Sequence, residues 1–329
     1  MATILLTGAT GFIGSNLARF LNSRGFAVRC LARKTSNVGQ LADFTTEICY
    51  GDVTQKQTLP IALNGADIVV HLAAIRGEKP MSMEEYREVN VSGTINLLET
   101  CRVQGVKRFI YCSTVGVMGW IRNPPADETY PANPIGAYHV TKARAEELVR
   151  EYTSRGLIEG TVVRPVITYG AGDRDGWVFR LARLLRNKRF IWIGDGANRV
   201  HLVAIENLMQ GFETIIKNRH SIGETLIIAD SAPITMNRVV RTICTALNVD
   251  PPSLRLPTSL VRSLAAVAAK LQPTLGGKEP LLTPMRVDVL TRDRCYDISK
   301  ARLLGYSPHI STPAGLRRAV EWMKSQQLI

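Results

Sequence analysis

A tyrosine and a lysine stand four residues apart in the segment Tyr138-His139-Val140-Thr141-Lys142. The pattern of residues 137–152 predicts a helix, on which positions i and i+4 project from the same face. A phenol with its usual pKa of about 10 is a poor base near neutrality, whereas a neighbouring ammonium favours the phenolate. The pair therefore suits proton transfer to or from an alcohol oxygen. A tyrosine that simply packs on a lysine stem is the alternative interpretation.

Three glycines follow the apolar run 2–6 in the segment Thr7-Gly8-Ala9-Thr10-Gly11-Phe12-Ile13-Gly14. This order predicts a strand, a turn and a helix. Gly8 would permit the tight turn, Gly11 the close approach of a pyrophosphate, and Gly14 close packing of the helix on the sheet. The start of the helix would supply unpaired amides. We expect dinucleotide phosphates here, with an ordinary strand-to-helix turn as the alternative.

The elements that position these groups alternate from residue 1 to about residue 170, as in parallel strands joined by helices. A helix is expected over 83–104, and strands at 2–7, 27–32, 47–50, 68–72, 109–113 and 160–164. This pattern predicts an α/β fold with a doubly wound parallel Rossmann sheet. The ligand crevice of such a sheet lies at the carboxyl ends of its strands, where both motifs fall.

Beyond residue 170 the pattern is less regular. Strands are expected at 190–193 and 225–229 and a helix at 205–217, so segments near 189–217 and 223–230 return to the sheet. Prolines between positions 251 and 284 interrupt regular elements. We therefore expect a dinucleotide-binding domain at 1–170, and a smaller, loop-rich substrate-binding domain formed by the remaining segments of 171–329.

The composition, 45% hydrophobic and 21% charged, is typical of a globular protein with a full core. The net charge is +13, but the basic residues are spread without an aromatic-interleaved stripe, which argues against a nucleic-acid partner. The basic cluster 180–189 is interpreted as a solvated helix face, with an anionic ligand as the alternative. Six scattered cysteines indicate reduced thiols, and we expect a cytoplasmic protein without a leader or a membrane span.

Seven motifs in order resemble the extended short-chain dehydrogenase/reductase family, within the NAD-dependent epimerase/dehydratase superfamily. They are TGATGFIG at 7–14, GDVT at 51–54, HLAA at 71–74, VNVSGTINLL at 89–98, Ser113-Thr114, YHVTK at 138–142 and RPVITYG at 164–170. Segments 277–283 and 296–308 resemble the branch of 3β-hydroxysteroid dehydrogenases and dihydroflavonol reductases.

The resemblance implies that Tyr138 exchanges a proton, that Lys142 lowers its pKa and binds the nicotinamide ribose, and that Thr114, with Ser113 as the fallback, holds the substrate oxygen. Val115 lies beside them on the substrate side. Met118 replaces the family's usual aromatic residue, so the role of that ring is not carried over. The cofactor residues implied are Gly8, Thr10, Gly11, Phe12, Ile13, Gly14, Asp52, Val53, Leu72, Ala73, Ala74, Asn90, Tyr138, Lys142, Pro165 and Val166.

The second expected strand ends at Ala32-Arg33-Lys34, without the carboxylate that an NAD enzyme offers to the ribose diol. Arg33 and Lys34 can instead pair with a 2′-phosphate. We therefore expect NADP(H) as the preferred cofactor, with NAD(H) as the alternative. The alternative interpretation is that Arg33 and Lys34 are solvated charges at the end of a strand and bind no phosphate.

Several further residues are interpreted with alternatives left open. Arg199, seven residues before Glu206, matches the spacing of a diphosphate-clamping arginine in nucleotide-sugar epimerases, and Arg294 is its candidate partner. For each of them, a surface arginine or an intramolecular ion pair is the alternative. His201 is a candidate for a substrate hydrogen bond, whereas His71 and His139 are given no chemical role, and no metal site is expected. The segment Leu260 to Leu271 is expected to cover the substrate pocket, with a dimer contact or an interfacial membrane helix as alternatives.

The leading hypothesis is an NADP(H)-dependent oxidoreductase that interconverts a secondary alcohol and a ketone on a ring-type, sterol-like or flavonoid-like molecule. The alternative is a nucleotide-sugar epimerase or dehydratase that uses bound NAD(P). A third hypothesis is a non-catalytic regulator that senses NADP(H). The expected partner is a small molecule, peripheral membrane contact is disfavoured, and the resemblance suggests a homodimer through helices 83–104 and 137–152.

Overall fold

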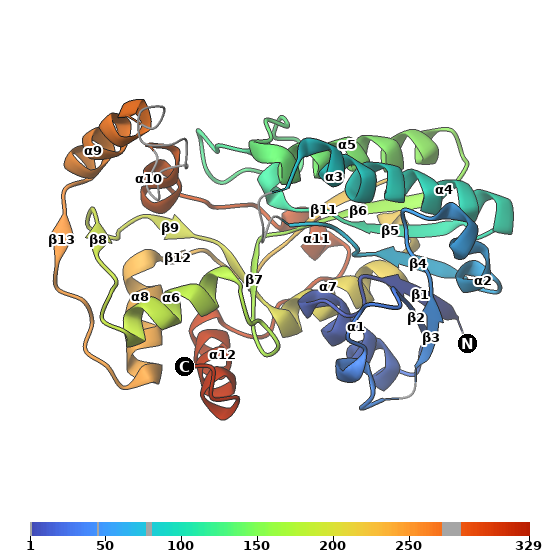
Figure 1. Ribbon diagram of the computed structural model, residues 1–329, viewed down its shortest axis with the longest axis horizontal. Helices are drawn as coiled ribbons and strands as arrows, with labels where there is room; N and C mark the ends of the chain where they lie inside the picture. The colour runs from blue at the N-terminus through green and yellow to red at the C-terminus, as the bar shows by residue number, and fades with distance from the viewer. Residues whose placement is uncertain (1, 45, 77–80, 272–283) are drawn as a thin grey trace.

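The computed structural model describes residues 2–44, 46–76, 81–271 and 284–329. Its centre is a seven-stranded parallel sheet with the strand order β11-β6-β5-β4-β1-β2-β3 (Figure 1). The doubly wound α/β fold is confirmed, and each strand begins and ends within one residue of its expected limits. The strands are β1 (Thr3–Thr7), β2 (Ala27–Ala32), β3 (Glu47–Tyr50), β4 (Ile68–His71), β5 (Arg108–Cys112), β6 (Glu159–Pro165) and β11 (Thr225–Ile228).

Helices cover both faces of this sheet, which is why its strands are apolar on both sides (Figure 1). Ile4 and Leu6 of β1 are buried in one core cluster, and Leu5 between them is buried in the cluster on the opposite face. The first face carries α1 (Phe12–Ser23) and α7 (Ile205–Lys217), and the second carries α2 (Leu59–Leu63), α4 (Gly93–Gln104) and α5 (Gly136–Ser154). Short 3₁₀ turns are η1 (Gly39–Leu41), η2 (Lys56–Thr58), η4 (Val115–Met118) and η5 (Arg219–Ser221).

The helix expected over 83–104 is present, but it is interrupted. It consists of α3 (Met83–Arg87), a π-helical turn η3 (Glu88–Ser92) and α4. Asn90, inside this turn, donates from Nδ2 to Ile75 O and accepts from Ile75 N at Oδ1. Such single π turns are typical of functional sites, because they place a side chain out of helical register.

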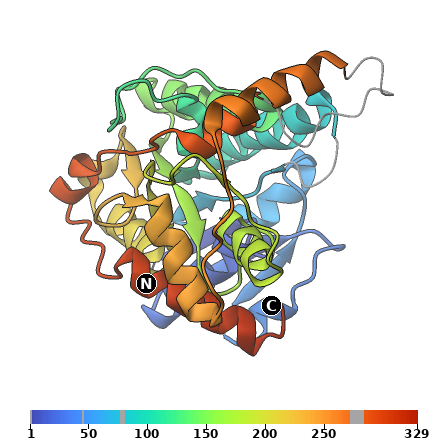
Figure 2. The same ribbon diagram turned by 90° about the vertical axis from the view of Figure 1, so that its left-hand side faces the viewer.

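The rest of the chain builds a second core at one end of the molecule, which faces the viewer in Figure 2. Buried Tyr169, Trp192 and Leu316 lie in this core. Its strands are β7 (Ile167–Tyr169), β8 (Trp192–Ile193), β9 (Arg199–Val200), β10 (Leu202–Ala204), β12 (Ile234–Thr235) and β13 (Arg255–Leu256). Its helices are α6 (Trp177–Arg186), α8 (Met236–Leu247) and α12 (Thr312–Ser325). Helices α9 (Thr258–Leu271) and α10 (Pro284–Thr291) form a separate small cluster, and α11 (Ser299–Leu303) packs beside β11 in the core of the central sheet.

The return of the chain to the central sheet is confirmed for helix 205–217, which is α7, and for strand 225–229, which is β11. The segment 190–193 does not return. Only Trp192 and Ile193 form a strand, and they pair with β13 instead of the central sheet. The Trp192 ring is buried in the second core with Phe190 packed edge-on against it, and that packing keeps the segment away from the central sheet.

Candidate active site

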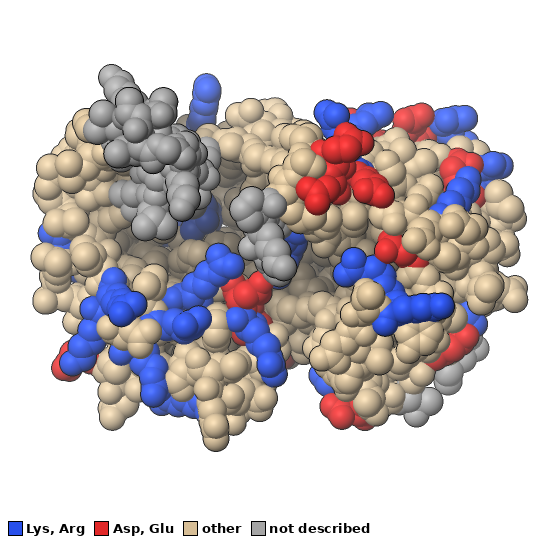
Figure 3. Space-filling model, viewed as in Figure 1, with Lys and Arg blue, Asp and Glu red and all other residues tan. Residues whose placement is uncertain are grey.

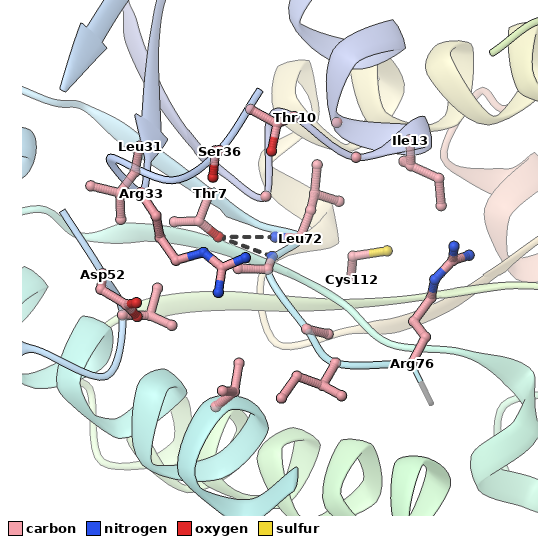
Figure 4. Close-up of a pocket in the computed structure, with 18 of the residues that line it drawn as sticks. Thr7, Thr10, Ile13, Leu31, Arg33, Ser36, Asp52, Leu72, Arg76 and Cys112 are labelled. Carbon is pink, nitrogen blue, oxygen red and sulfur yellow. Dashed lines mark hydrogen bonds between the residues drawn. The ribbon is translucent and has the colours of Figure 1, made fainter. Parts of the chain in front are cut away.

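A cavity of about 450 Å³ lies at the carboxyl ends of β1, β2, β4 and β5, where the sheet topology predicts ligand binding (Figure 4). Fifteen of the predicted site residues line it. They are Gly8, Thr10, Gly11, Phe12, Ile13, Gly14, Arg33, Asp52, Val53, Leu72, Ala73, Ala74, Ser113, Tyr138 and Lys142. The fold therefore brings motifs that lie between Gly8 and Lys142 in the sequence to the wall of one cavity.

The glycine turn between β1 and α1 is tight for steric reasons. Gly8 has φ +69°, and a Cβ there would lie 2.7 Å from Ala73 N, so a larger residue would push β1 and β4 apart. A Cβ on Gly14 would overlap Gly8 O. Because Gly11 at the helix start carries no side chain, the first amides of α1 remain available to an anion in the cavity.

A buried chain of hydrogen bonds fixes the ends of β1 and β4 beneath this turn. Thr94 Oγ1 donates to Asn90 O, so it accepts from His71 Nε2. His71 Nδ1 then accepts from Thr7 Oγ1, which itself accepts from the Leu72 and Ala73 amides. Burial, and secondarily the charge of Lys142, lowers the pKa of His71 to about 3, so the ring stays neutral. His71 is therefore a structural link, as its position at a strand end suggested.

One end of the cavity collects groups suited to an adenosine moiety. Figure 4 shows Arg33 reaching into the cavity from the end of β2, with Asp52 on the same side. Ser36, which the sequence interpretation missed, also lines this end, and its amide donates to Arg33 O. The Asp52 carboxylate forms hydrogen bonds within its own loop, since Oδ1 accepts from the Thr54 amide and hydroxyl. Lys34 is exposed and lies outside the cavity lining, so only one of the two predicted cations faces the site.

The other end brings Tyr138 and Lys142 together with Cys112 and Ser113. Burial is the main cause that raises the pKa of Tyr138 above its ordinary value, and the phenol is therefore protonated near neutrality. Burial also lowers the pKa of Lys142 to about 8. The Lys142 ammonium lies over the Tyr111 ring. Burial raises the pKa of the Cys112 thiol to about 11. The thiol is therefore protonated near neutrality and is not an activated nucleophile.

Two adjacent hydroxyls follow β5, and they differ in their surroundings. Ser113 is 4% exposed and lines the cavity, yet its Oγ forms no hydrogen bond of normal geometry within the described part of the chain. It faces the Glu146 carboxylate closely enough to help lower that group's pKa. Thr114 caps the N-terminus of η4 and lies outside the cavity lining. Its Oγ1 accepts from the Gly116 amide, which leaves the hydroxyl proton to donate elsewhere. Val115 is buried in η4 outside the cavity lining.

Beneath Ser113 lies a buried ion pair that the sequence interpretation did not single out. Arg164 donates from Nε to Glu146 Oε1 at 3.0 Å and from Nη2 to Oε2 at 2.7 Å. Glu146 stands four residues after Lys142 on α5, so this helical spacing was the available signal. Arg76 was also missed. It lines the cavity beyond Ala74 and pairs with Asp175 at 3.4 Å.

Besides Lys34, three residues predicted to touch the cofactor lie outside the cavity lining. Asn90 is buried, and besides its bonds to Ile75 it donates to Thr141 Oγ1 at 3.0 Å. It therefore positions the cavity wall and α5 instead of facing the cavity. Pro165 and Val166 are buried at the end of β6 and do not line the cavity either.

The two predicted substrate residues of the second core have other partners. Arg199 Nη2 donates to Asp293 Oδ2 at 2.7 Å and its amide donates to Asp293 Oδ1. His201 is buried, with Nε2 donating to Asp230 O and Nδ1 accepting from the Tyr296 amide. Both ring nitrogens thus join backbone segments, which corrects the expectation of a hydrogen bond from His201 to substrate. Arg294 Nε is buried and has no hydrogen-bond partner among the residues that the structure describes.

Comparison with known proteins agrees with this geometry. Residues 4–229 match the NAD dependent epimerase/dehydratase family. A 2-alkyl-3-oxoalkanoate reductase from Stenotrophomonas maltophilia (strain K279a) is 31% identical, with 96% of this chain and 97% of that protein covered. A 3 beta-hydroxysteroid dehydrogenase/Delta 5-->4-isomerase from Mycobacterium tuberculosis (strain CDC 1551 / Oshkosh) is 30% identical, with 99% and 91% covered.

A third relative acts on a different substrate class. The N-acetyl-alpha-D-glucosaminyl-diphospho-ditrans,octacis-undecaprenol 4-epimerase of Escherichia coli O157:H7 is 30% identical, with 97% of this chain and 94% of that protein covered. The expected resemblance to the family and to its steroid dehydrogenase branch is confirmed, while these relatives span both reductases and an epimerase.

Proposed function

Because the chain belongs to the NAD dependent epimerase/dehydratase family, we propose that it is an NADP(H)-dependent oxidoreductase that interconverts a secondary alcohol and a ketone. The observation that carries this assignment is that Tyr138, Lys142 and Ser113 line the same cavity as the glycine turn. A dinucleotide fits these residues, since Gly11 leaves the amides of α1 open at one wall and a Cβ would fill the cradle at Gly8. When bound, its nicotinamide supplies or accepts the hydride.

Three residues at the Tyr138 end of the cavity have separate roles in the proposed reaction. Tyr138 carries its proton near neutrality, because burial raises its pKa, and it donates that proton to the oxygen of a ketone being reduced. Thr114 donates a hydrogen bond to the same oxygen and orients it. Lys142, with a pKa of about 8, is largely charged at pH 7 and stabilises developing negative charge nearby.

Three features support NADP(H) over NAD(H). Arg33 reaches into the cavity at its adenosine end, and Ser36 lines the same end. No carboxylate occurs between Ala32 and Ser36 in the sequence. A guanidinium and a hydroxyl provide charge-assisted and neutral hydrogen bonds to a 2′-phosphate.

The substrate is proposed to be an uncharged, ring-type alcohol or ketone. The Arg199 guanidinium is already paired with Asp293, so a substrate diphosphate would have to compete with that carboxylate. The similarity to an oxoalkanoate reductase and to a 3 beta-hydroxysteroid dehydrogenase supports the same class.

A second candidate is an epimerase of diphosphate-linked sugars. Arg294 favours it, because its buried Nε, which has no partner in the described part of the chain, would gain one from a diphosphate oxygen. The similarity to the Escherichia coli undecaprenol-linked epimerase points the same way. Arg199→Ala distinguishes the two candidates, since it would weaken binding of a UDP-sugar strongly and leave that of an uncharged ketone nearly unchanged.

Turnover tests the leading assignment. The purified protein is expected to consume NADPH with members of a panel of cyclic ketones, and Tyr138→Phe is expected to lower kcat by at least about 100-fold while NADPH still binds. A Tyr138→Phe variant as active as the wild type would contradict the assignment, as would UDP-sugar epimerisation by a protein that reduces no ketone.

A further inference from the structure

Helix α9 has one buried and one exposed apolar face. Val261 and Ala265 are buried in a small cluster with Val287 of α10. Leu260, Leu264 and Val267 follow at i, i+4 and i+7 on another face, and they are 49%, 59% and 55% exposed. No described residue of α9 lines the cavity, so the expectation that this helix covers the pocket is not supported for that cavity.

Two more exposed apolar side chains, Leu254 and Ile191, directly precede β13 and β8 at the same end of the molecule. Trp192 of β8 donates its amide to Leu254 O, which brings Leu254 next to Ile191. Both side chains are about as exposed as those of α9. We call Ile191, Leu254, Leu260, Leu264 and Val267 the α9 surface. Large apolar side chains grouped in this way on a soluble protein mark a contact site.

The two sequence segments that carry the α9 surface are basic and contain no acidic residue. Segment 177–193, which contains α6, has five arginines and lysines and no aspartate or glutamate. Segment 254–271 has three basic residues and no acidic one. Arg180, Arg183, Arg186, Lys188 and Arg189 are all exposed.

These two segments lie at the same end of the molecule (Figures 1 and 2). Figure 3 shows Lys and Arg side chains gathered over this end, where Figure 1 draws α6. The charge of Arg262 is partly neutralised, because its Nη2 lies 3.3 Å from Oδ2 of Asp288 on α10.

We propose that the α9 surface docks on an anionic lipid bilayer, with the apolar side chains in the boundary between headgroups and acyl chains and the basic residues on the lipid phosphates. An amphipathic helix with apolar residues on one side and cations beside them is suited to this contact. A second copy of the chain is disfavoured as the occupant, since an isologous contact would press two basic surfaces together. Nucleic acid offers charge but no apolar phase for the exposed leucines.

This contact is interfacial. Among the described residues, no helix has the length and apolar character to cross a bilayer. The contact also stands apart from the proposed chemistry, because none of the five residues of the α9 surface lines the cavity.

Flotation with vesicles tests the docking directly. The full-length protein is expected to float with phosphatidylcholine vesicles that contain anionic phosphatidylglycerol at least about tenfold more than with pure phosphatidylcholine, and to be released by high salt. The variant Leu260→Glu/Leu264→Glu is expected to lose the binding. Ile61→Glu, which alters a similarly exposed apolar side chain on α2, is the matched control and should float like the wild type.

A spectroscopic measurement covers the case in which the double variant fails to fold. Leu264→Trp places a fluorophore on the α9 surface, and brominated acyl chains should quench its added emission. Absence of flotation by the wild type at low salt would overturn the proposal, as would equal flotation of the Leu260→Glu/Leu264→Glu variant when it is folded, or an unquenched Leu264→Trp. Self-association without lipid binding would identify a second copy as the occupant and would also overturn it.

Discussion

The Lys142 ammonium lies 4.1 Å from the centre of the Tyr111 ring, inside the wall of the cavity. Lys142 is 2% exposed, and burial is the main cause that lowers its pKa to about 8, opposed by its electrostatic interactions with Cys112 and Glu146. A cation above an aromatic face is stabilised, and more strongly when it is desolvated. Tyr111 therefore helps a buried lysine to remain charged where the proposed chemistry needs it.

Replacing Tyr111 with leucine is expected to shift the pH dependence of turnover. A reaction that needs charged Lys142 is active below the pKa of the lysine and declines as the pH rises through about 8. Tyr111→Leu removes the ring, so the charged form loses about 0.5–2 kcal/mol and the decline should begin at a lower pH. Measuring kcat/KM between pH 6 and pH 9.5 checks this. Tyr111→Phe keeps the ring and should keep the wild-type profile, whereas equal shifts in both variants would refute a role for the ring.

Thr114 is expected to contribute more to turnover than Ser113. Thr114→Val removes the hydroxyl that is proposed to donate to the substrate oxygen, and loss of one such donor typically lowers kcat by about 100-fold or more. Ser113→Ala should have the smaller effect on kcat, because that hydroxyl faces Glu146. Steady-state kinetics of both variants with the same ketone makes the comparison, with NADPH binding as the control for folding. A larger loss of kcat in Ser113→Ala than in Thr114→Val would show that Ser113, and not Thr114, orients the substrate oxygen.

Arg33 is expected to decide between the two cofactors. Loss of a charge-assisted hydrogen bond costs about 1.5–3 kcal/mol, so Arg33→Ala should raise the Kd for NADPH by about 10- to 100-fold and change the Kd for NADH little. Lys34→Ala is the matched control, since this neighbouring cation lies outside the cavity lining. Fluorescence titration of each protein with both cofactors measures the effect. Tighter binding of NADH than of NADPH by the wild type would contradict the expected preference.

The strands and the glycine turn could be predicted because their signals are local. Apolar β-rich runs mark each strand of the central sheet, and Gly8, Gly11 and Gly14 have roles that follow from missing Cβ atoms within one turn. Tyr138 and Lys142 could be paired because a helix places positions i and i+4 on one face. The sheet topology then carries both motifs to the same edge.

Contacts between distant elements could not be predicted in this way. Arg199 meets Asp293 across 94 residues of sequence, and nothing near Arg199 shows that its charge is already paired. Lys142 reaches the Tyr111 ring only because α5 packs beside β5. The interruption of helix 83–104 at Asn90 depends on hydrogen bonds to the loop at Ile75, which helical periodicity does not encode.

The buried pair of Glu146 and Arg164 is expected to hold the wall beneath Ser113 in place. Both side chains are almost fully buried, and two hydrogen bonds join them. Glu146→Gln leaves the Arg164 guanidinium buried without its counter-charge, which should lower the free energy of unfolding by about 3–5 kcal/mol. Glu147→Gln, on the exposed face of the same helix, removes the partner of Arg144 and should cost about 0–1 kcal/mol. Urea unfolding of the two variants and the wild type measures both values.

The loss of stability in Glu146→Gln relative to the wild type should depend on pH. Burial alone would raise the pKa of Glu146, but the hydrogen bonds and charge of Arg164 hold it below its ordinary value of 4.5. A carboxylate whose pKa is depressed by folding contributes stability above its unfolded pKa, and that contribution is lost as the pH falls through the folded value. The stability difference between the wild type and Glu146→Gln should therefore be constant from pH 8 to about pH 5 and shrink below pH 4.5. A difference that stays constant down to pH 3 would show that packing, and not the carboxylate charge, is what the substitution removes.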